Sequence, residues 1–123
     1  MKSLGRHVMA ELYNCDVKIL QDVRSIENVM REAAESTKAH IIDVVFHKFN
    51  PHGVSGVIVI AESHLAIHTW PEYGFASVDI YTCGNEVKPW KAFKFISRRL
   101  RAKTSNALEM RRGILNIPAR RLK

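Results

Sequence analysis

The stretch ESHLAIHTWPEYG, residues 62–74, places chemically reactive side chains in a segment that otherwise alternates like a β-strand. Within it lie Glu62, Ser63, His68 and Trp70. A strand that only packs against a core carries apolar residues on one face and scattered solvated groups on the other. A hydroxyl, an imidazole and an indole in one short strand are instead typical of a binding or catalytic surface.

A hairpin in this region would bring a cysteine to the same pair of strands. The turn residues PEYG separate the strand at 65–70 from a second strand, FASVDIYTC, at 75–83. Antiparallel pairing across this turn puts the apolar positions of both strands on one shared face, which should meet the core. We therefore predict that Ser63, His68 and Cys83 gather around the opposite, non-core face.

Each of these three residues also has an ordinary structural interpretation. A strand histidine is often a satisfied polar residue, a buried cysteine a small hydrophobic residue, and a serine at a strand end part of a turn. A serine and a histidine five residues apart could suggest a hydrolase. However, the sequence has no GxSxG elbow and no evident carboxylate to orient the histidine. The two cysteines have no CxxC spacing, so we predict no metal site.

Length and composition limit the alternatives. With 123 residues, 46% of them hydrophobic, the chain can form one domain with one core, residues 1–123. It has no apolar run long enough to cross a membrane and no signal-peptide pattern, so we expect a cytoplasmic protein whose cysteines are thiols. The formal charge of +7 allows a nucleic-acid-binding module as an alternative. The basic residues concentrate in 88–103 and in the tail RRGILNIPARRLK, without a recognised nucleic-acid motif.

Periodicity predicts the elements that must position the reactive residues. Predicted strands cover residues 6–13, 40–49, 54–62, 65–70 and 75–83, with a short last strand at 107–110. Apolar spacing predicts a helix from Ile19 to about Ser36, which Asp16 can cap, and a second helix that Pro89 opens. This order of elements indicates an α+β fold with an antiparallel sheet and two helices on one face.

Three segments together resemble a known family. They are FHKFNPHGVSGVIVIAESHLAIHTWPEYGFASVDIYTCG at 46–84, KSLGRHVMAELYNCD at the start, and PWKAF after Cys83. These segments resemble the prokaryotic, pyruvoyl-dependent S-adenosylmethionine decarboxylases. The basic tail after Lys103 matches the family weakly, and no role is carried over to it.

The resemblance implies a proenzyme that cleaves itself between Glu62 and Ser63, into a β chain of residues 1–62 and an α chain of residues 63–123. The Ser63 hydroxyl would attack the carbonyl of Glu62, and β-elimination from the ester would then break the chain. Ser63 would become a covalent pyruvoyl group, the pyruvate cofactor of the enzyme. The resemblance makes His68 the base that removes the α-proton, a role suited to an imidazole, and gives Ser55 an assisting role.

The same resemblance implies how the substrate is bound and decarboxylated. The pyruvoyl ketone would form a Schiff base with the amine of S-adenosylmethionine and accept electrons as carbon dioxide leaves. Cys83 would deliver the proton to the substrate carbon, Phe49 and Trp70 would sandwich the adenine, and Glu72 would lie near the substrate. The product would serve spermidine synthesis.

The family fold is a two-layer α/β sandwich whose sheet face pairs with that of a second copy, which implies a homodimer with active sites at or near the interface. Two alternatives stay open. Relatives with the same chemistry decarboxylate arginine or ornithine, although Phe49, Trp70 and the GVSG pattern favour the adenosyl substrate. A basic nucleic-acid-binding module would leave the grouping of Ser63, His68 and Cys83 without a purpose.

Overall fold

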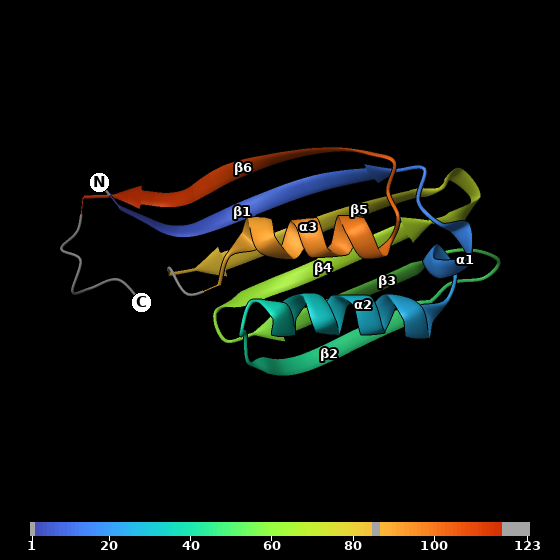
Figure 1. The fold of residues 1–123 in the computed structure, drawn as a ribbon. Coiled ribbons are helices and arrows are strands. Elements are labelled where there is room, and N and C mark those ends of the chain that lie inside the picture. Colours follow the sequence, from blue (N-terminus) through green and yellow to red (C-terminus); the bar gives the residue numbers. More distant parts are fainter. Residues whose placement is uncertain (1, 85–86, 117–123) are drawn as a thin grey trace.

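A computed structural model describes residues 2–84 and 87–116 and has one six-stranded antiparallel sheet with helices on one side (Figure 1). The strand order is β2-β3-β4-β5-β1-β6. The strands are β1 (Lys2–Tyr13), β2 (Ile41–Lys48), β3 (Val54–Ile60), β4 (Ser63–Trp70), β5 (Phe75–Cys83) and β6 (Thr104–Leu115). The helices are α1 (Val17–Leu20), α2 (Val23–Ser36) and α3 (Pro89–Arg99), with a short 3₁₀ turn, η1 (Pro71–Tyr73).

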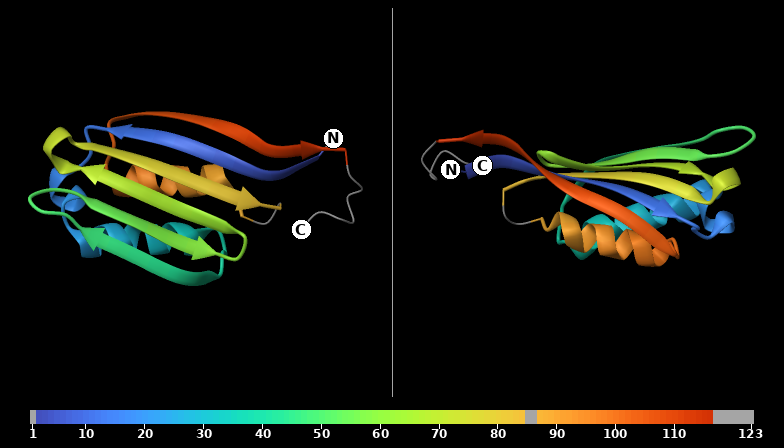
Figure 2. Two further views of the ribbon diagram at one scale, coloured as in Figure 1. Left: turned by 180° about the vertical axis from the view of Figure 1, so that it is seen from behind. Right: turned by 90° about the horizontal axis from the view of Figure 1, so that it is seen from above.

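The predicted α+β architecture is confirmed. Helices α2 and α3 cover one face of the sheet, and Figure 2 shows the opposite face, which we call the open face, without a helix against it. The β4–β5 register is the one predicted from the four-residue turn, with Ile67 opposite Val78 and His68 opposite Ser77. Gly74 takes a left-handed conformation with φ 62° and closes the turn, where a side chain would be strained.

Two elements differ from the prediction. The first predicted helix is broken after Leu20, because Asp22 adopts an extended conformation and accepts a hydrogen bond from the Ser25 hydroxyl at 2.5 Å. Asp16 caps the short helix before the break, as predicted, through its Oδ1 atom and the backbone N–H of Lys18 at 2.9 Å. The last strand, β6, is much longer than predicted because it pairs along almost all of β1.

The core lies between the sheet and the two longer helices. Helix α2 buries Ile26, Met30 and Ala33, and α3 buries Ala92 and Ile96. Trp90 and Phe93 of α3 are only partly buried at the edge of this core. Burial of these side chains supplies the main driving force for folding.

The basic residues Lys91, Lys94 and Arg98 of α3 are exposed. The end of the basic tail, residues 117–123, lies outside the described residues. Within 2–84 and 87–116, no helix has the length and apolar character needed to cross a membrane.

The open face carries both polar and apolar side chains. Its central row crosses the sheet from Val45 through Val57, Ala66 and Asp79 to Met9 and Leu108, as the strand registers place them. Val45 is 57% exposed and Leu108 is 58% exposed. Large apolar side chains at these exposures, on a face without a covering layer, are typical of an interaction surface.

Candidate active site

The candidate cleavage bond lies at the tight connection between β3 and β4. Ile60, the last residue of β3, pairs with Ser63, the first residue of β4, so only Ala61 and Glu62 form the turn. Ala61 has a positive φ of 38°, a conformation that two-residue hairpin turns require and that residues with a Cβ atom adopt at a cost. The Glu62–Ser63 bond is therefore held at the exit of a constrained turn.

Cys83 contacts both sides of this bond. Its backbone N–H donates a hydrogen bond to Ser63 Oγ at 3.0 Å, and its thiol donates one to the carbonyl oxygen of Glu62 at 3.1 Å. Ser63 is 8% exposed. The structure thus brings together Glu62, Ser63 and Cys83, which we call the cleavage-bond cluster.

His68 lies far from this cluster. Burial alternates along β4, so that Ser63 lies on the buried face with Leu65, while His68 is exposed on the open face. The prediction that Ser63 and His68 share one face is wrong, because an odd number of positions along a strand separates opposite faces. Their separation of five positions also corresponds to about 17 Å along the strand.

His68 instead forms a second group, the histidine cluster, at the other end of β4. Its Nδ1 atom lies 2.8 Å from the Ser55 hydroxyl, directly across from it on β3. Trp70 packs near the imidazole, with ring centroids 6.4 Å apart and the rings tilted by 47°. A serine hydroxyl at this distance can orient the imidazole and exchange a proton with it.

The two candidate adenine-binding residues lie at this same end of the sheet. Phe49 follows β2 and is 46% exposed, and its ring packs edge-on against His47 with centroids 4.5 Å apart. Trp70 ends β4 and is 39% exposed. Strand β3 lies between these two strands, so two exposed aromatic rings stand on either side of it.

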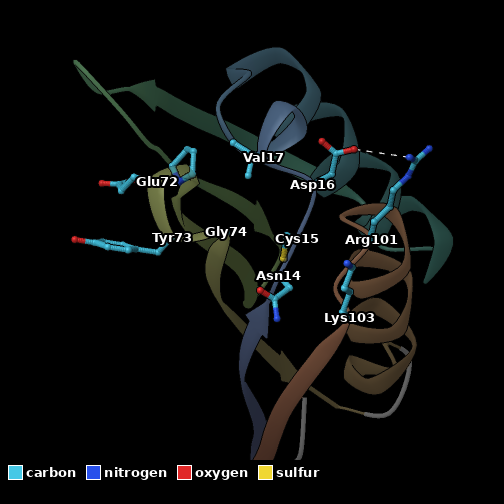
Figure 3. A pocket seen from close by; sticks show the side chains of 10 residues that line it. Asn14, Cys15, Asp16, Val17, Glu72, Tyr73, Gly74, Arg101 and Lys103 are labelled. Carbon is cyan, nitrogen blue, oxygen red and sulfur yellow. Dashed lines mark ion pairs between the residues drawn. The ribbon is translucent and has the colours of Figure 1, made fainter.

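Glu72 lies two positions after Trp70, at the end of β4 where the histidine cluster stands. It belongs to η1 and lines a surface cavity of about 540 Å³ that also contains Asn14, Asp16 and Arg101 (Figure 3). Asp16 and Arg101 form an ion pair at 3.7 Å on one side of the cavity, and Glu72 lies on the other side and extends away from that pair. In the described part of the chain, the lining of this cavity includes neither the cleavage-bond cluster nor His68.

Comparisons with known proteins identify the family. A family model described as S-adenosylmethionine decarboxylase matches residues 6–113. The chain belongs to the S-adenosylmethionine decarboxylase family. The resemblance inferred from the sequence is therefore confirmed at the level of the family.

Individual relatives agree with this assignment over nearly the whole chain. A protein of Caldanaerobacter subterraneus subsp. tengcongensis named S-adenosylmethionine decarboxylase proenzyme is 53% identical over 120 residues, covering 98% of this chain and 97% of that protein. A proenzyme of the same name from Pelotomaculum thermopropionicum is 56% identical, covering 94% and 91%. The crystal structure of the adenosylmethionine decarboxylase from Aquifex aeolicus has a TM-score of 0.90 at 35% identity, covering 97% and 98%.

This member of the family also has a polar and aromatic neighbourhood around Cys83 that the sequence reasoning did not identify. Tyr81 lies two positions before Cys83, and its partners across the neighbouring strands are His64 and His7. Burial raises the pKa of Tyr81, and the charge and hydrogen bonding of Cys83 raise it further, against the effect of Arg112. The strand alternation could have placed Tyr81 with Cys83, but the β1–β5 pairing is non-local.

The other cysteine has no place in this chemistry. Cys15 is 6% exposed, and burial raises the pKa of its thiol to about 11. A thiol in these surroundings stays protonated and unreactive at neutral pH. Within residues 2–84 and 87–116, histidine, cysteine and acidic residues also form no group that could hold a metal ion.

Proposed function

We propose that this chain is a proenzyme that cleaves itself between Glu62 and Ser63 and then decarboxylates S-adenosylmethionine, using a pyruvoyl group derived from Ser63. The observation that carries the proposal is the contact of Cys83 with both sides of this bond, at 3.0 Å to Ser63 Oγ and 3.1 Å to Glu62 O. Family membership and the name of the relatives, decarboxylase proenzyme, support the same conclusion.

The contacts support a specific first step of cleavage. The Cys83 N–H holds the Ser63 hydroxyl oxygen at the turn, beside the carbonyl carbon that it attacks. As the new C–O bond forms, negative charge develops on the Glu62 carbonyl oxygen, where the Cys83 thiol donates its hydrogen bond. Donors placed at a developing oxyanion lower the barrier of acyl transfer. Breaking the C–N bond, with the hydroxyl proton passing to the departing nitrogen, then leaves Glu62 joined to the Ser63 oxygen as an ester and Ser63 with a free amine.

The second step requires a base that removes the Ser63 α-proton. His68 is the assigned base, yet it lies about 17 Å along β4 from Ser63, on the opposite face of the strand. When the base removes the Ser63 α-proton, the ester C–O bond breaks and Glu62 leaves as a carboxylate. The resulting dehydroalanine hydrolyses to the pyruvoyl group with loss of ammonia. For His68 to act as this base, a second chain must bring it to Ser63.

A homodimer formed through the open faces would meet this requirement. A two-fold axis between the two faces, perpendicular to the strands, places opposite ends of the two sheets against each other. The histidine cluster of one copy then lies near the cleavage-bond cluster of the other. The exposed apolar side chains of the central row, Val45 and Leu108, would be covered by the same pairing.

The residues present also fit the decarboxylation chemistry. When formed, the pyruvoyl group supplies an electron-accepting carbonyl next to the substrate amine. Cys83 lies beside Ser63, where its thiol can donate a proton to the substrate carbon. Phe49 and Trp70 present aromatic faces suited to an adenine ring and a cationic sulfonium, whereas Glu72 would have to reach the substrate from η1.

Intact mass of the denatured protein tests the proposal directly. We expect two fragments split before Ser63, with the second carrying a mass that fits an N-terminal pyruvoyl group. Reduction with a hydride reagent in a mixture of S-adenosylmethionine, arginine and ornithine should trap the adduct of the true substrate. Ser63→Ala is the control and should stay uncut. A parent chain that stays uncut on long incubation would contradict the proposal, and an arginine or ornithine adduct would replace its substrate.

A further inference from the structure

Tyr81 is placed to act on Cys83. Both residues lie on the open side of β5, two positions apart. The Tyr81 ring stacks on His64 of β4 with centroids 5.6 Å apart and an angle of 25°. It also meets His7 of β1 edge-on, at 5.8 Å and 87°. Two neighbouring strands therefore hold the ring from both sides, which limits its rotamers.

Gly5 provides the space that the Tyr81 ring occupies. Gly5 lies directly across from Cys83 in the β1–β5 register. A Cβ atom built at Gly5 would lie 2.6 Å from the Tyr81 hydroxyl oxygen and 2.8 Å from Cζ. The phenol therefore leans over the backbone of the residue opposite Cys83, and any side chain at position 5 would displace it.

A series of polar contacts between Arg112, His7 and Asp79 lies beside the Tyr81 ring. The Arg112 guanidinium carbon lies 5.8 Å from the Tyr81 ring centroid, and Nη1 lies 3.3 Å from His7 Nδ1. Because guanidinium only donates, His7 Nδ1 is the acceptor here, and His7 Nε2 then donates to Asp79 Oδ1 at 3.2 Å. Arg112 also pairs with Gly5 across the β1–β6 register, so residues of three other strands hold the phenol.

We propose that Tyr81 is a positioning residue for Cys83: its phenol donates to the Cys83 sulfur and so holds the thiol on the Glu62 carbonyl. The raised pKa of Tyr81 agrees with a phenol that stays protonated and can donate. Hydrogen bonds in series polarise one another, so the phenol strengthens the thiol as a donor to Glu62. The effect of Tyr81 on self-cleavage rests on the proposed function. The proposed hydrogen bond from Tyr81 to Cys83 does not depend on it.

The test measures the thiol itself, in a chain that cannot cleave. In the Ser63→Ala background, the rate of alkylation of Cys83 by iodoacetamide is followed by peptide mass spectrometry across a pH series, with buried Cys15 as internal reference. Tyr81→Phe keeps the ring and removes the hydroxyl. Losing a hydrogen bond to the thiolate should slow alkylation about threefold at the acidic end of the series, because fewer thiols are ionised while each thiolate is more nucleophilic. Tyr73→Phe, at a tyrosine that is 76% exposed, is the matched control and should match the parent.

Two further measurements connect the contact to function. Gly5→Ala should slow alkylation like Tyr81→Phe, and the double variant should be no slower than either single one, since both act through the phenol. With Ser63 restored, Tyr81→Phe should slow self-cleavage about threefold to tenfold. Alkylation and cleavage of Tyr81→Phe at parent rates would overturn the inference. A parent that never cleaves would overturn the proposed function instead, while the alkylation rates would still decide the role of Tyr81.

Discussion

The thiol of Cys83 lies 3.1 Å from the carbonyl oxygen of Glu62, on the amino side of the candidate cleavage bond. The sequence resemblance gave Cys83 a role only as the acid of decarboxylation. In the uncut chain the same thiol is a hydrogen-bond donor at the atom where an oxyanion would form. One side chain could therefore serve both the formation of the cofactor and its later use.

Replacing Cys83 should consequently affect cleavage as well as turnover. We expect Cys83→Ala to self-cleave about tenfold more slowly, because a thiol is a weaker donor than the amides of known oxyanion holes. Cys83→Ser keeps a donor and should recover part of the rate. The measurement is the fraction of cut chain against time by intact mass. Cys15→Ala controls for loss of a thiol elsewhere, and cleavage of Cys83→Ala at the parent rate would remove the thiol from the cleavage step.

The separation of Ser63 from His68 predicts complementation between two inactive chains. Neither Ser63→Ala nor His68→Ala should cleave alone. When the two are produced together, hybrids of the proposed dimer should bring the intact Ser63 of one chain to the intact His68 of the other. With random pairing, roughly half of the His68→Ala chains should then be cut. The two chains differ in mass, so intact mass identifies which is cut, and no cleavage in the mixture would argue against a shared site.

Part of this arrangement was predictable from the sequence. The turn PEYG and the alternation on either side of it gave the β4–β5 register correctly, because a short hairpin fixes its own pairing. Counting positions would also have shown that Ser63 and His68 lie on opposite faces and far apart. The resemblance led to the right set of reactive residues, but the strand pattern alone did not bring them together.

The rest depends on contacts between distant parts of the chain. Gly5 and His7 reach Cys83 and Tyr81 only because β1 inserts between β5 and β6. No local pattern indicates that pairing. The length of β6 likewise follows from its partner β1 rather than from its own residues, which include many charged and polar side chains that do not favour a strand.

Two buried threonines should respond oppositely to the same substitution. The Thr82 hydroxyl is buried and has no hydrogen-bond partner within the described residues. Thr69 donates to the Leu20 carbonyl at 2.8 Å and accepts from the Val54 N–H at 2.9 Å. Thr82→Val should leave the free energy of unfolding unchanged or raise it by about 1 kcal/mol, whereas Thr69→Val should lower it by about 2 kcal/mol or more.

Urea unfolding at one chain concentration, in the uncleaved Ser63→Ala background, measures both threonine variants. Fixing the concentration matters because the proposed dimer would add to the apparent stability. A loss in Thr82→Val as large as that in Thr69→Val would mean that the Thr82 hydroxyl has a partner after all.

His64 should make the fold sensitive to mild acid. Burial lowers the pKa of His64 from its ordinary value of 6.5, and the neighbouring His7 lowers it further, while Asp79 opposes both. The unfolded chain therefore takes up a proton at a higher pH than the folded chain. Above about pH 6.5, the lowered pKa of His64 makes its full contribution to the free energy of unfolding. This contribution is lost as the pH falls through the lowered pKa of the folded chain.

The variant His64→Phe isolates this contribution to the pH dependence. It keeps an aromatic ring against Tyr81 and removes the titrating group. We expect the Ser63→Ala chain to lose stability between pH 7 and pH 5 more steeply than the same chain carrying His64→Phe. Urea unfolding across this pH range provides the comparison, and the difference between the two curves removes the contributions of His7 and the other histidines. Parallel curves would show that His64 is not the group responsible.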